Sequence, residues 1–217
     1  MSAPRCVIFD CDGVLIDSEG MVCALEAEAL TRAGYPITGR EVARRFAGVP
    51  GPLLYAEIEA ETGLTLQPTL HQEVQEAAIA AYQRDLKPLP GAKTFLESLD
   101  RPFCVASSSA PAKLALGLVM TELYDLLYPN IFSASLVAKG KPFPDIFLYA
   151  AERMGADPAD CLVIEDSVAG AKAAAAAGMR CVGFTGGGHI APGHGEALRR
   201  EGVIGVIDRL ADADAFL

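Results

Sequence analysis

The chain has 217 residues, of which 51% are hydrophobic and 21% are charged, and its net charge at pH 7 is −10. This length suits one domain, or one domain with an insertion, and the apolar content argues against a disordered chain. The acidic balance argues against nucleic-acid or membrane partners, because binding either surface requires an excess of Lys and Arg.

The apolar runs are too short for a membrane span of roughly 18 residues. The first run stops at Asp10, which also makes it too short for the core of a signal peptide. The six cysteines occur singly, without a C-x-x-C pair, so the sequence indicates neither a zinc site nor a disulfide framework. We therefore expect a cytoplasmic protein, and its size is compatible with a monomer.

Six short apolar runs are typical of buried parallel strands, because they do not alternate apolar with polar residues. They lie at residues 6–9, 103–106, 130–132, 161–164, 181–184 and 203–206. After residue 90 they are separated by helical patterns at about 91–99, 111–127, 144–154, 167–177 and 195–201. This alternation predicts an α/β fold with a doubly wound parallel sheet, which is a Rossmann-like core.

Residues 17–86 contain several helical patterns and no strand-like run. Val22, Leu25 and Ala29 are spaced for one face of a helix, and Thr38 and Glu41 have the spacing of a capping box. An all-helical segment of roughly 70 residues is too long for an ordinary β–α connection. We therefore expect a helical cap at residues 17–86, inserted into a core formed by residues 1–16 and 87–217.

Polar residues follow four of the predicted strands, at or just beyond the point where each strand ends. Because the carboxyl ends of parallel strands meet at one edge of a sheet, we expect these residues to share one crevice. In chain order the set is Asp10 and Asp12, Ser107 and Ser108, Lys141, and Glu165 and Asp166.

A crevice that holds several carboxylates needs a cation, since two unit charges 4 Å apart repel by roughly 4 kcal/mol at an effective dielectric constant of about 20. Mg²⁺ suits a few carboxylates together with a substrate phosphate. One carboxylate can attack phosphorus, the serines offer donors at a helix start, and the lysine adds positive charge. The set predicts a phosphoryl-transfer site with Mg²⁺ as cofactor and a small phosphorylated metabolite as substrate.

The order of these motifs resembles the haloacid-dehalogenase-like hydrolase superfamily, and most closely its β-phosphoglucomutase-like phosphatases with a helical cap. The resemblance covers nearly the whole chain. It rests on residues 9–18 (FDCDGVLIDS), 141–145 (KPFPD) and 163–171 (VIEDSVAGA), with Ser107 in the expected place between them. It implies a Mg²⁺-dependent phosphoric monoester hydrolase.

The resemblance implies that the first motif carries the chemistry. Asp10 would be the nucleophile and a metal ligand, and it would form an aspartyl-phosphate. Asp12 would be the general acid and base, with its backbone carbonyl on the metal. Dehalogenases of the superfamily lack an acid at this position, so Asp12 favours phosphate over carbon–halogen chemistry.

The later motifs are implied to hold the phosphoryl group and the metal. Ser107 and Lys141 would bind the phosphoryl group, with help from the backbone N–H of Ser108. Asp166 would complete the metal ligands. Glu165 would be either a further ligand or a partner behind the ligands.

Two alternatives to a phosphatase stay open, and the first is a sugar phosphomutase of the β-phosphoglucomutase type. Sugar-phosphate mutases of the family carry a cap His near the position of Val22 and a cap Arg after the Gly48-Val49 step, and this sequence has neither. We therefore expect a phosphatase for a sugar phosphate or a phosphosugar acid, selected by residues 46–55. The third hypothesis is a non-enzymatic phospho-aspartate switch, against which Asp12 argues because a positioned acid/base speeds turnover.

A Gly-rich segment near the C-terminus formally fits a dinucleotide fingerprint, G-x-G-x-x-A, at residues 186–191. Pro192 and Gly193 block the helix that should begin there. His189 and His194 lie in the same segment and are residues of a metal-binding type. We expect a solvated loop instead.

Overall fold

The structure is a computed structural model that describes residues 3–46, 49 and 51–217. Six parallel strands form one sheet in the order β3-β2-β1-β4-β5-β6. The predicted doubly wound α/β fold is confirmed, and the strand bounds differ from the predicted ones by at most two residues. The strands are β1 (Cys6–Phe9), β2 (Phe103–Ser107), β3 (Ile131–Ser133), β4 (Cys161–Glu165), β5 (Arg180–Phe184) and β6 (Gly205–Ile207).

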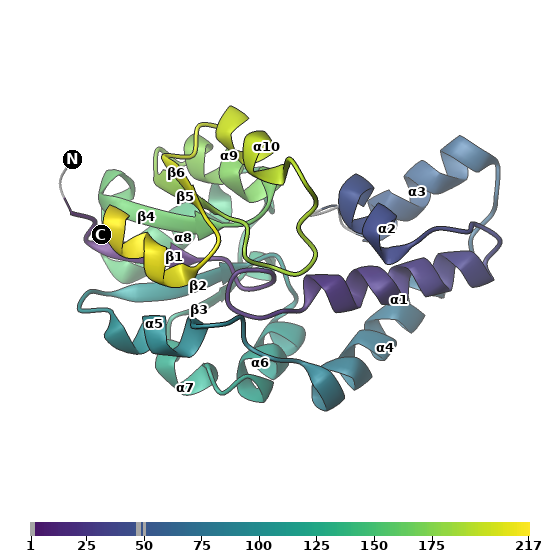
Figure 1. Cartoon of the computed structure of the whole chain (residues 1–217), viewed down its shortest axis with the longest axis horizontal. Helices are drawn as coiled ribbons and strands as arrows, with labels where there is room; N and C mark the ends of the chain where they lie inside the picture. The colour runs from purple at the N-terminus through teal and green to yellow at the C-terminus, as the bar shows by residue number, and fades with distance from the viewer. Residues whose placement is uncertain (1–2, 47–48, 50) are drawn as a thin grey trace.

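Helices cover both faces of the sheet, and successive strand residues pack against opposite layers. Val7 and Phe9 of β1 face one layer, and Cys6 and Ile8 face the other. The first layer contains α5 (Ala92–Ser98), α6 (Pro111–Met120) and α7 (Tyr124–Leu127), and the second contains α8 (Asp145–Met154), α9 (Val168–Ala176) and α10 (His194–Arg200) (Figure 1).

The single helix predicted over residues 111–127 is wrong, because α6 and α7 are separate helices. Glu122 between them has a φ of 58°, in the left-handed region. The N–H of Leu123 donates to the carbonyl of Leu118, and the N–H of Glu122 donates to that of Val119. This pair of bonds is a Schellman motif, and the fully buried Leu123 supplies the apolar contact that accompanies it.

Four helices lie together to one side of the sheet, at the right of Figure 1. Most of their buried apolar side chains, among them Leu30, Phe46 and Ile58, form a separate hydrophobic cluster, whereas Tyr82 of α4 packs with the first layer of the sheet. The capping box is confirmed, since Thr38 N–H donates to Glu41 Oε2 at 2.9 Å and Glu41 N–H donates to Thr38 Oγ1 at 3.2 Å. The helices are α1 (Glu19–Arg32), α2 (Gly39–Phe46), α3 (Gly51–Thr62) and α4 (Leu70–Asp85).

The two segments that join these helices to the sheet run side by side. The N–H of Asp17 donates to the carbonyl of Lys87 at 3.0 Å, and the N–H of Leu89 donates to that of Leu15 at 2.9 Å. Ile16 lies between these two bonds and forms a bridge with residue 88. The chain therefore enters and leaves this group of helices at one place, just beyond the carboxyl end of β1.

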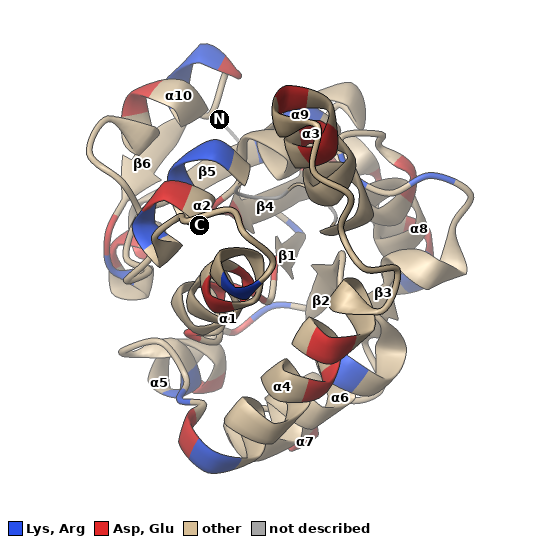
Figure 2. Cartoon of the chain, turned by 90° about the vertical axis from the view of Figure 1, so that its right-hand side faces the viewer, with Lys and Arg blue, Asp and Glu red and all other residues tan. Residues whose placement is uncertain are grey.

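The surface of the described residues carries charges of both signs. Figure 2 looks at the molecule from the side of α1–α4 and shows acidic and basic residues interspersed over the helices. Among the helices that the structure describes, none combines the length and the apolarity that crossing a bilayer would need.

Candidate active site

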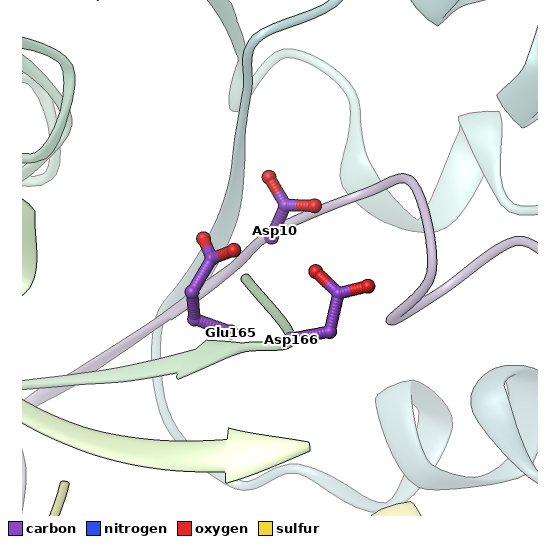
Figure 3. Close-up of side chains that lie close together, drawn as sticks. All are labelled: Asp10, Glu165 and Asp166. Carbon is purple, nitrogen blue, oxygen red and sulfur yellow. The ribbon is translucent and has the colours of Figure 1, made fainter. Parts of the chain in front are cut away.

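Three carboxylates meet where the strand order reverses, at the carboxyl ends of β1 and β4 (Figure 3). Asp10 follows β1, Glu165 ends β4, and Asp166 comes next. The N–H of Asp10 donates to the carbonyl of Ile164 at 2.9 Å, which fixes the two chain segments against each other. Each of the three carboxylates offers an oxygen that lies within 4.8 Å of the other two.

A buried ammonium group bridges two of these carboxylates. Lys141 Nζ donates to Asp10 Oδ1 at 2.5 Å and to Glu165 Oε2 at 2.7 Å, and its side chain is only 4% exposed. Burial alone would lower the pKa of Lys141, but the two carboxylates outweigh it and raise that pKa above its ordinary value. Lys141 is therefore a permanent positive charge at the centre of the site.

One ammonium group does not balance three carboxylates. Burial and the charge of Glu165 raise the pKa of Asp10 well above its usual range, against the pull of Lys141. The pKa of Asp166 is raised for the same two reasons. Because a hard divalent cation would remove this repulsion and prefers oxygen ligands, the three carboxylates fit such an ion.

The carboxylate of Glu165 is held on both oxygens. The backbone N–H and the hydroxyl of Ser167 donate to Oε1 at 3.0 and 2.7 Å, while Lys141 donates to Oε2. Gly170 in α9 leaves the space that the carboxylate occupies, since a Cβ there would lie 2.0 Å from Glu165 Cδ. Glu165 is thus fixed as the partner that orients Lys141.

Asp12 stands apart from the three-carboxylate cluster. The hydroxyls of Ser18 and Ser109 each donate to its carboxylate at 2.7 Å, and the hydroxyl of Ser107 donates at 3.3 Å. Burial alone would raise the pKa of Asp12, but the charge of Lys113 and these hydroxyls together lower it. The side chain is therefore an ionised carboxylate held in a defined position.

A cavity of about 550 Å³ opens over these residues. The exposed Ser108 lines it, whereas Ser107 is fully buried and accepts a hydrogen bond from the N–H of Ser109 at 2.9 Å. The opposite side of the cavity comes from helices α1–α4. The lining side chains there include Glu19, Glu26, Phe46, Leu54, His71 and Gln75.

The segment 46–55, which the sequence analysis proposes for substrate selection, reaches this cavity. Val49 and Pro52 line it, together with Phe46 and Leu54. Ala47, Gly48 and Pro50 belong to the same segment but lie outside the described residues.

The expectation of a solvated histidine loop is wrong for His189. Its side chain is 6% exposed, and Nε2 lies 3.0 Å from Asp166 Oδ2. His194 Nε2 contacts the backbone carbonyl of Asp166 at 2.5 Å. Gly187 makes room for the buried ring, since a Cβ there would lie 2.6 Å from His189 Cε1. The two imidazoles position Asp166, and local sequence could not show this because the loop after β5 folds back over the end of β4.

Lys113 is a further candidate residue of the site, and no sequence motif indicated it. It lies in the first turn of α6, lines the cavity, and lowers the pKa of Asp12 through its charge. Its Nζ lies 5.4 Å from the centre of the Tyr82 ring. The serine run before α6 was the available signal, but only the direction of that helix brings Lys113 toward the cavity.

Comparison with known proteins identifies the family. The family model described as haloacid dehalogenase-like hydrolase matches residues 4–178. The 6-phosphogluconate phosphatase of Escherichia coli (strain K12) is 30% identical over 193 residues, which are 88% of this chain and 87% of that protein.

Two solved structures show the same fold over nearly the whole chain. A conserved haloacid dehalogenase-like protein from Agrobacterium tumefaciens str. C58 is 39% identical, with a TM-score of 0.92 and coverage of 98% of this chain and 97% of that one. A haloacid dehalogenase family hydrolase from Deinococcus radiodurans R1 is 32% identical, with a TM-score of 0.83 and coverage of 99% and 95%.

The chain therefore belongs to the haloacid dehalogenase-like hydrolase family, and the resemblance read from its motifs is confirmed. Within that family it is an enzyme of the phosphoric monoester hydrolase class.

Replacing Gly170 by Ala tests how Glu165 is held. The added methyl would overlap the carboxyl group of Glu165, whereas the control Gly20→Ala places a methyl in another helix where no atom lies within 4 Å. Both variants gain the same helix propensity, so the difference between them isolates the overlap. We expect Gly170→Ala to have a free energy of unfolding about 1–3 kcal/mol below that of Gly20→Ala in urea denaturation. Equal stability of the two variants would contradict the position of Glu165.

Proposed function

We propose that this enzyme is a Mg²⁺-dependent phosphatase that hydrolyses a small phosphorylated metabolite in the cytoplasm through an aspartyl-phosphate on Asp10. The observation that carries the proposal is the contact of the Asp10 carboxylate with buried Lys141, beside two further carboxylates in one cavity. The Escherichia coli relative is named as a phosphatase of 6-phosphogluconate, and the Deinococcus structure contains phosphate and sodium. The name of the Escherichia coli relative favours a sugar phosphate or a phosphosugar acid as substrate.

The metal would be held by the oxygen atoms around Asp10. We assign the carboxylates of Asp10 and Asp166 as ligands, with the backbone carbonyl of Asp12, to which no hydrogen bond is found among the described residues. Both oxygens of Glu165 already accept hydrogen bonds from Ser167 and Lys141. We therefore propose that Glu165 does not bind the metal directly and instead orients Lys141. Bound Mg²⁺ would neutralise the carboxylates and stabilise the charge on the phosphoryl oxygens.

In the first step an oxygen of Asp10 attacks phosphorus, and the bond from phosphorus to the leaving oxygen breaks. Asp12 gives its proton to that leaving oxygen. The nearby phosphate raises the pKa of Asp12 by like-charge repulsion, which lets this carboxylate carry the proton. Lys141, the N–H of Ser108 and the hydroxyl of Ser107 hold the phosphoryl group, for which Ser107 gives up its bond to Asp12.

In the second step a water molecule attacks the phosphorus of the aspartyl-phosphate. Asp12 accepts a proton from the water, and the bond from phosphorus to the Asp10 oxygen breaks. Inorganic phosphate leaves and the Asp10 carboxylate is restored. The hydroxyls of Ser18 and Ser109 hold Asp12 ready for this role, which argues against a long-lived phospho-aspartate switch.

We further propose that residues 17–86 act as a movable cap. The two segments that connect them to the sheet lie side by side, with the N–H of Asp17 bonded to the carbonyl of Lys87. Paired connections of this kind let a group of helices rotate as a unit about one place. Closure would exclude water during the first step, and opening would admit it for the second.

Removing the nucleophile is the direct test of the mechanism. Asp10→Asn is expected to lower the rate of p-nitrophenyl phosphate hydrolysis by at least about 10³-fold, because an amide oxygen is a poor nucleophile toward phosphorus. The matched control is Asp125→Asn, which changes an exposed Asp on α7 and should keep full activity. Full activity in Asp10→Asn would contradict the proposal.

Removing the metal tests the cofactor. EDTA is expected to abolish hydrolysis, because the carboxylates of the site then repel the phosphate dianion. Added Mg²⁺ should restore the rate, and Ca²⁺ should restore less of it because the larger ion prefers more ligands in a looser arrangement. Hydrolysis that continues unchanged after dialysis against EDTA would rule out Mg²⁺ dependence.

A mutase reading makes a different prediction for sugar bisphosphates. A mutase must hold the distal phosphate with cap cations, and none of the described residues of α1–α4 that line the cavity is Lys or Arg. Incubation with β-glucose 1-phosphate and glucose 1,6-bisphosphate is therefore expected to release inorganic phosphate. Accumulation of glucose 6-phosphate in a coupled assay, without free phosphate, would favour the mutase instead.

A further inference from the structure

The end of the cavity farthest from the sheet presents two polar side chains that the catalytic steps do not use. Glu26 on α1 and His71 on α4 both line the cavity. A Cβ at Gly51 would lie 2.6 Å from His71 Nδ1 and 3.7 Å from Glu26 Oε1, so the two side chains face the same point.

Each of these side chains has a hydrogen-bonding atom to spare. Glu26 is 94% buried, since its exposure is 6%, and Tyr55 OH donates to its Oε2 at 2.6 Å. Among the described residues no donor reaches Glu26 Oε1. His71 Nδ1 is buried and also finds no partner there. Buried polar atoms are normally satisfied, so the unpartnered Nδ1 of His71 indicates a missing partner. Oε1 of Glu26 is not buried in this way and is accessible from the cavity, so one ligand there can bond to both side chains.

The charges around this point oppose a ligand end of either sign. Glu26 and Glu19 line this side of the cavity and would repel an anion. Burial raises the pKa of both glutamates, and the charge of Lys113, which also lines the cavity, opposes this rise only in part. The ammonium group of Lys113 would repel a cation. Because Asp12 and the two glutamates already attract this ammonium group, it offers an anion little net attraction. An uncharged group meets neither repulsion.

We propose that the far end of the cavity binds an uncharged, hydroxyl-bearing end of the phosphorylated substrate through Glu26 and His71, and that it discriminates against substrates with a second anionic group. A hydroxyl suits the pair because it donates its one hydrogen to Glu26 Oε1 while its oxygen accepts a hydrogen bond from the Nδ1–H of His71. The inference rests on the proposed phosphatase function and narrows it to polyol or sugar monophosphates, away from phosphosugar acids.

The test uses phosphate esters that differ only at the far end. The pairs are 2-hydroxyethyl phosphate and phosphoglycolate, glycerol 3-phosphate and 3-phosphoglycerate, and sorbitol 6-phosphate and 6-phosphogluconate. Within each pair a hydroxymethyl group replaces a carboxylate. Phosphoethanolamine adds a cationic partner for 2-hydroxyethyl phosphate. We expect kcat/KM for the hydroxyl member to exceed that of its charged partner by about tenfold or more in the best-hydrolysed pair.

Two variants connect the preference to Glu26. Glu26→Gln keeps the size of the side chain and removes its charge, so the hydroxyl-to-carboxylate ratio of kcat/KM should fall about fivefold or more. Glu28→Gln makes the same change two residues along α1, at an exposed side chain paired with Arg32. It should leave the ratio unchanged. Circular dichroism checks that both variants keep the fold.

Binding to the Asp10→Asn variant makes the outcome independent of turnover. Calorimetric Kd values for the same pairs should show the same preference. The inference is overturned if the carboxylate or ammonium member binds as well as the hydroxyl member, if no hydroxyl member binds, or if Glu26→Gln leaves the ratio intact. If the carboxylate members are preferred and Lys113→Met abolishes that preference, the far end of the cavity binds a carboxylate through Lys113, and the inference is overturned. Hydrolysis of p-nitrophenyl phosphate reports on the phosphatase function itself, so failure of either proposal is seen separately.

Discussion

The rest of the site depends on the burial of three carboxylates beside a single ammonium group at the carboxyl ends of the two central strands of the sheet. Asp10, Glu165 and Asp166 lie within hydrogen-bonding reach of a common point, and Lys141 contacts two of them. Such an excess of negative charge in a buried place is costly unless a further cation joins it. The raised pKa values of Asp10 and Asp166 express the same imbalance.

The topology explains why the carboxylates meet. The chain runs from β1 outward through β2 and β3, and then continues on the other side of β1 with β4. The ends of β1 and β4 are therefore neighbours. The chain leaves the end of β1 toward one side of the sheet and the end of β4 toward the other, which opens a crevice between them. Close packing then needs small residues. Gly13 has a φ of +83°, and a Cβ there would lie 2.0 Å from Asp166 Oδ2, so glycine satisfies both the turn and the space.

Asp10, Ser107 and Glu165 could be predicted from sequence because each lies at the end of an apolar run, and the ends of parallel strands meet at one side of a sheet. Lys141 lies eight residues beyond β3, and only its motif indicated it. Glu26, His71 and His189 could not be predicted in this way. Val22, Leu25 and Ala29 suggested an apolar helix face, yet Glu26 on the same helix is more buried than Val22 or Leu25. Its burial depends on Tyr55, which lies 29 residues further along the chain. Contacts between helices set such positions, and local patterns do not contain them.

The acidity of the chain takes on a specific meaning at the cavity. A net charge of −10 would seem unsuited to an anionic substrate. At the carboxyl ends of the strands the local charge is different, because Asp10 and Glu165 hold Lys141 there and the carboxylates around it fit a divalent cation. The side of the cavity formed by α1–α4 contributes Glu19 and Glu26, and the acids near Lys113 offset its charge, so only Lys141 is left to attract an anionic group. We infer that the two ends of the cavity select different parts of one molecule, a phosphate beside Lys141 and a neutral, hydroxylated group beside Glu26.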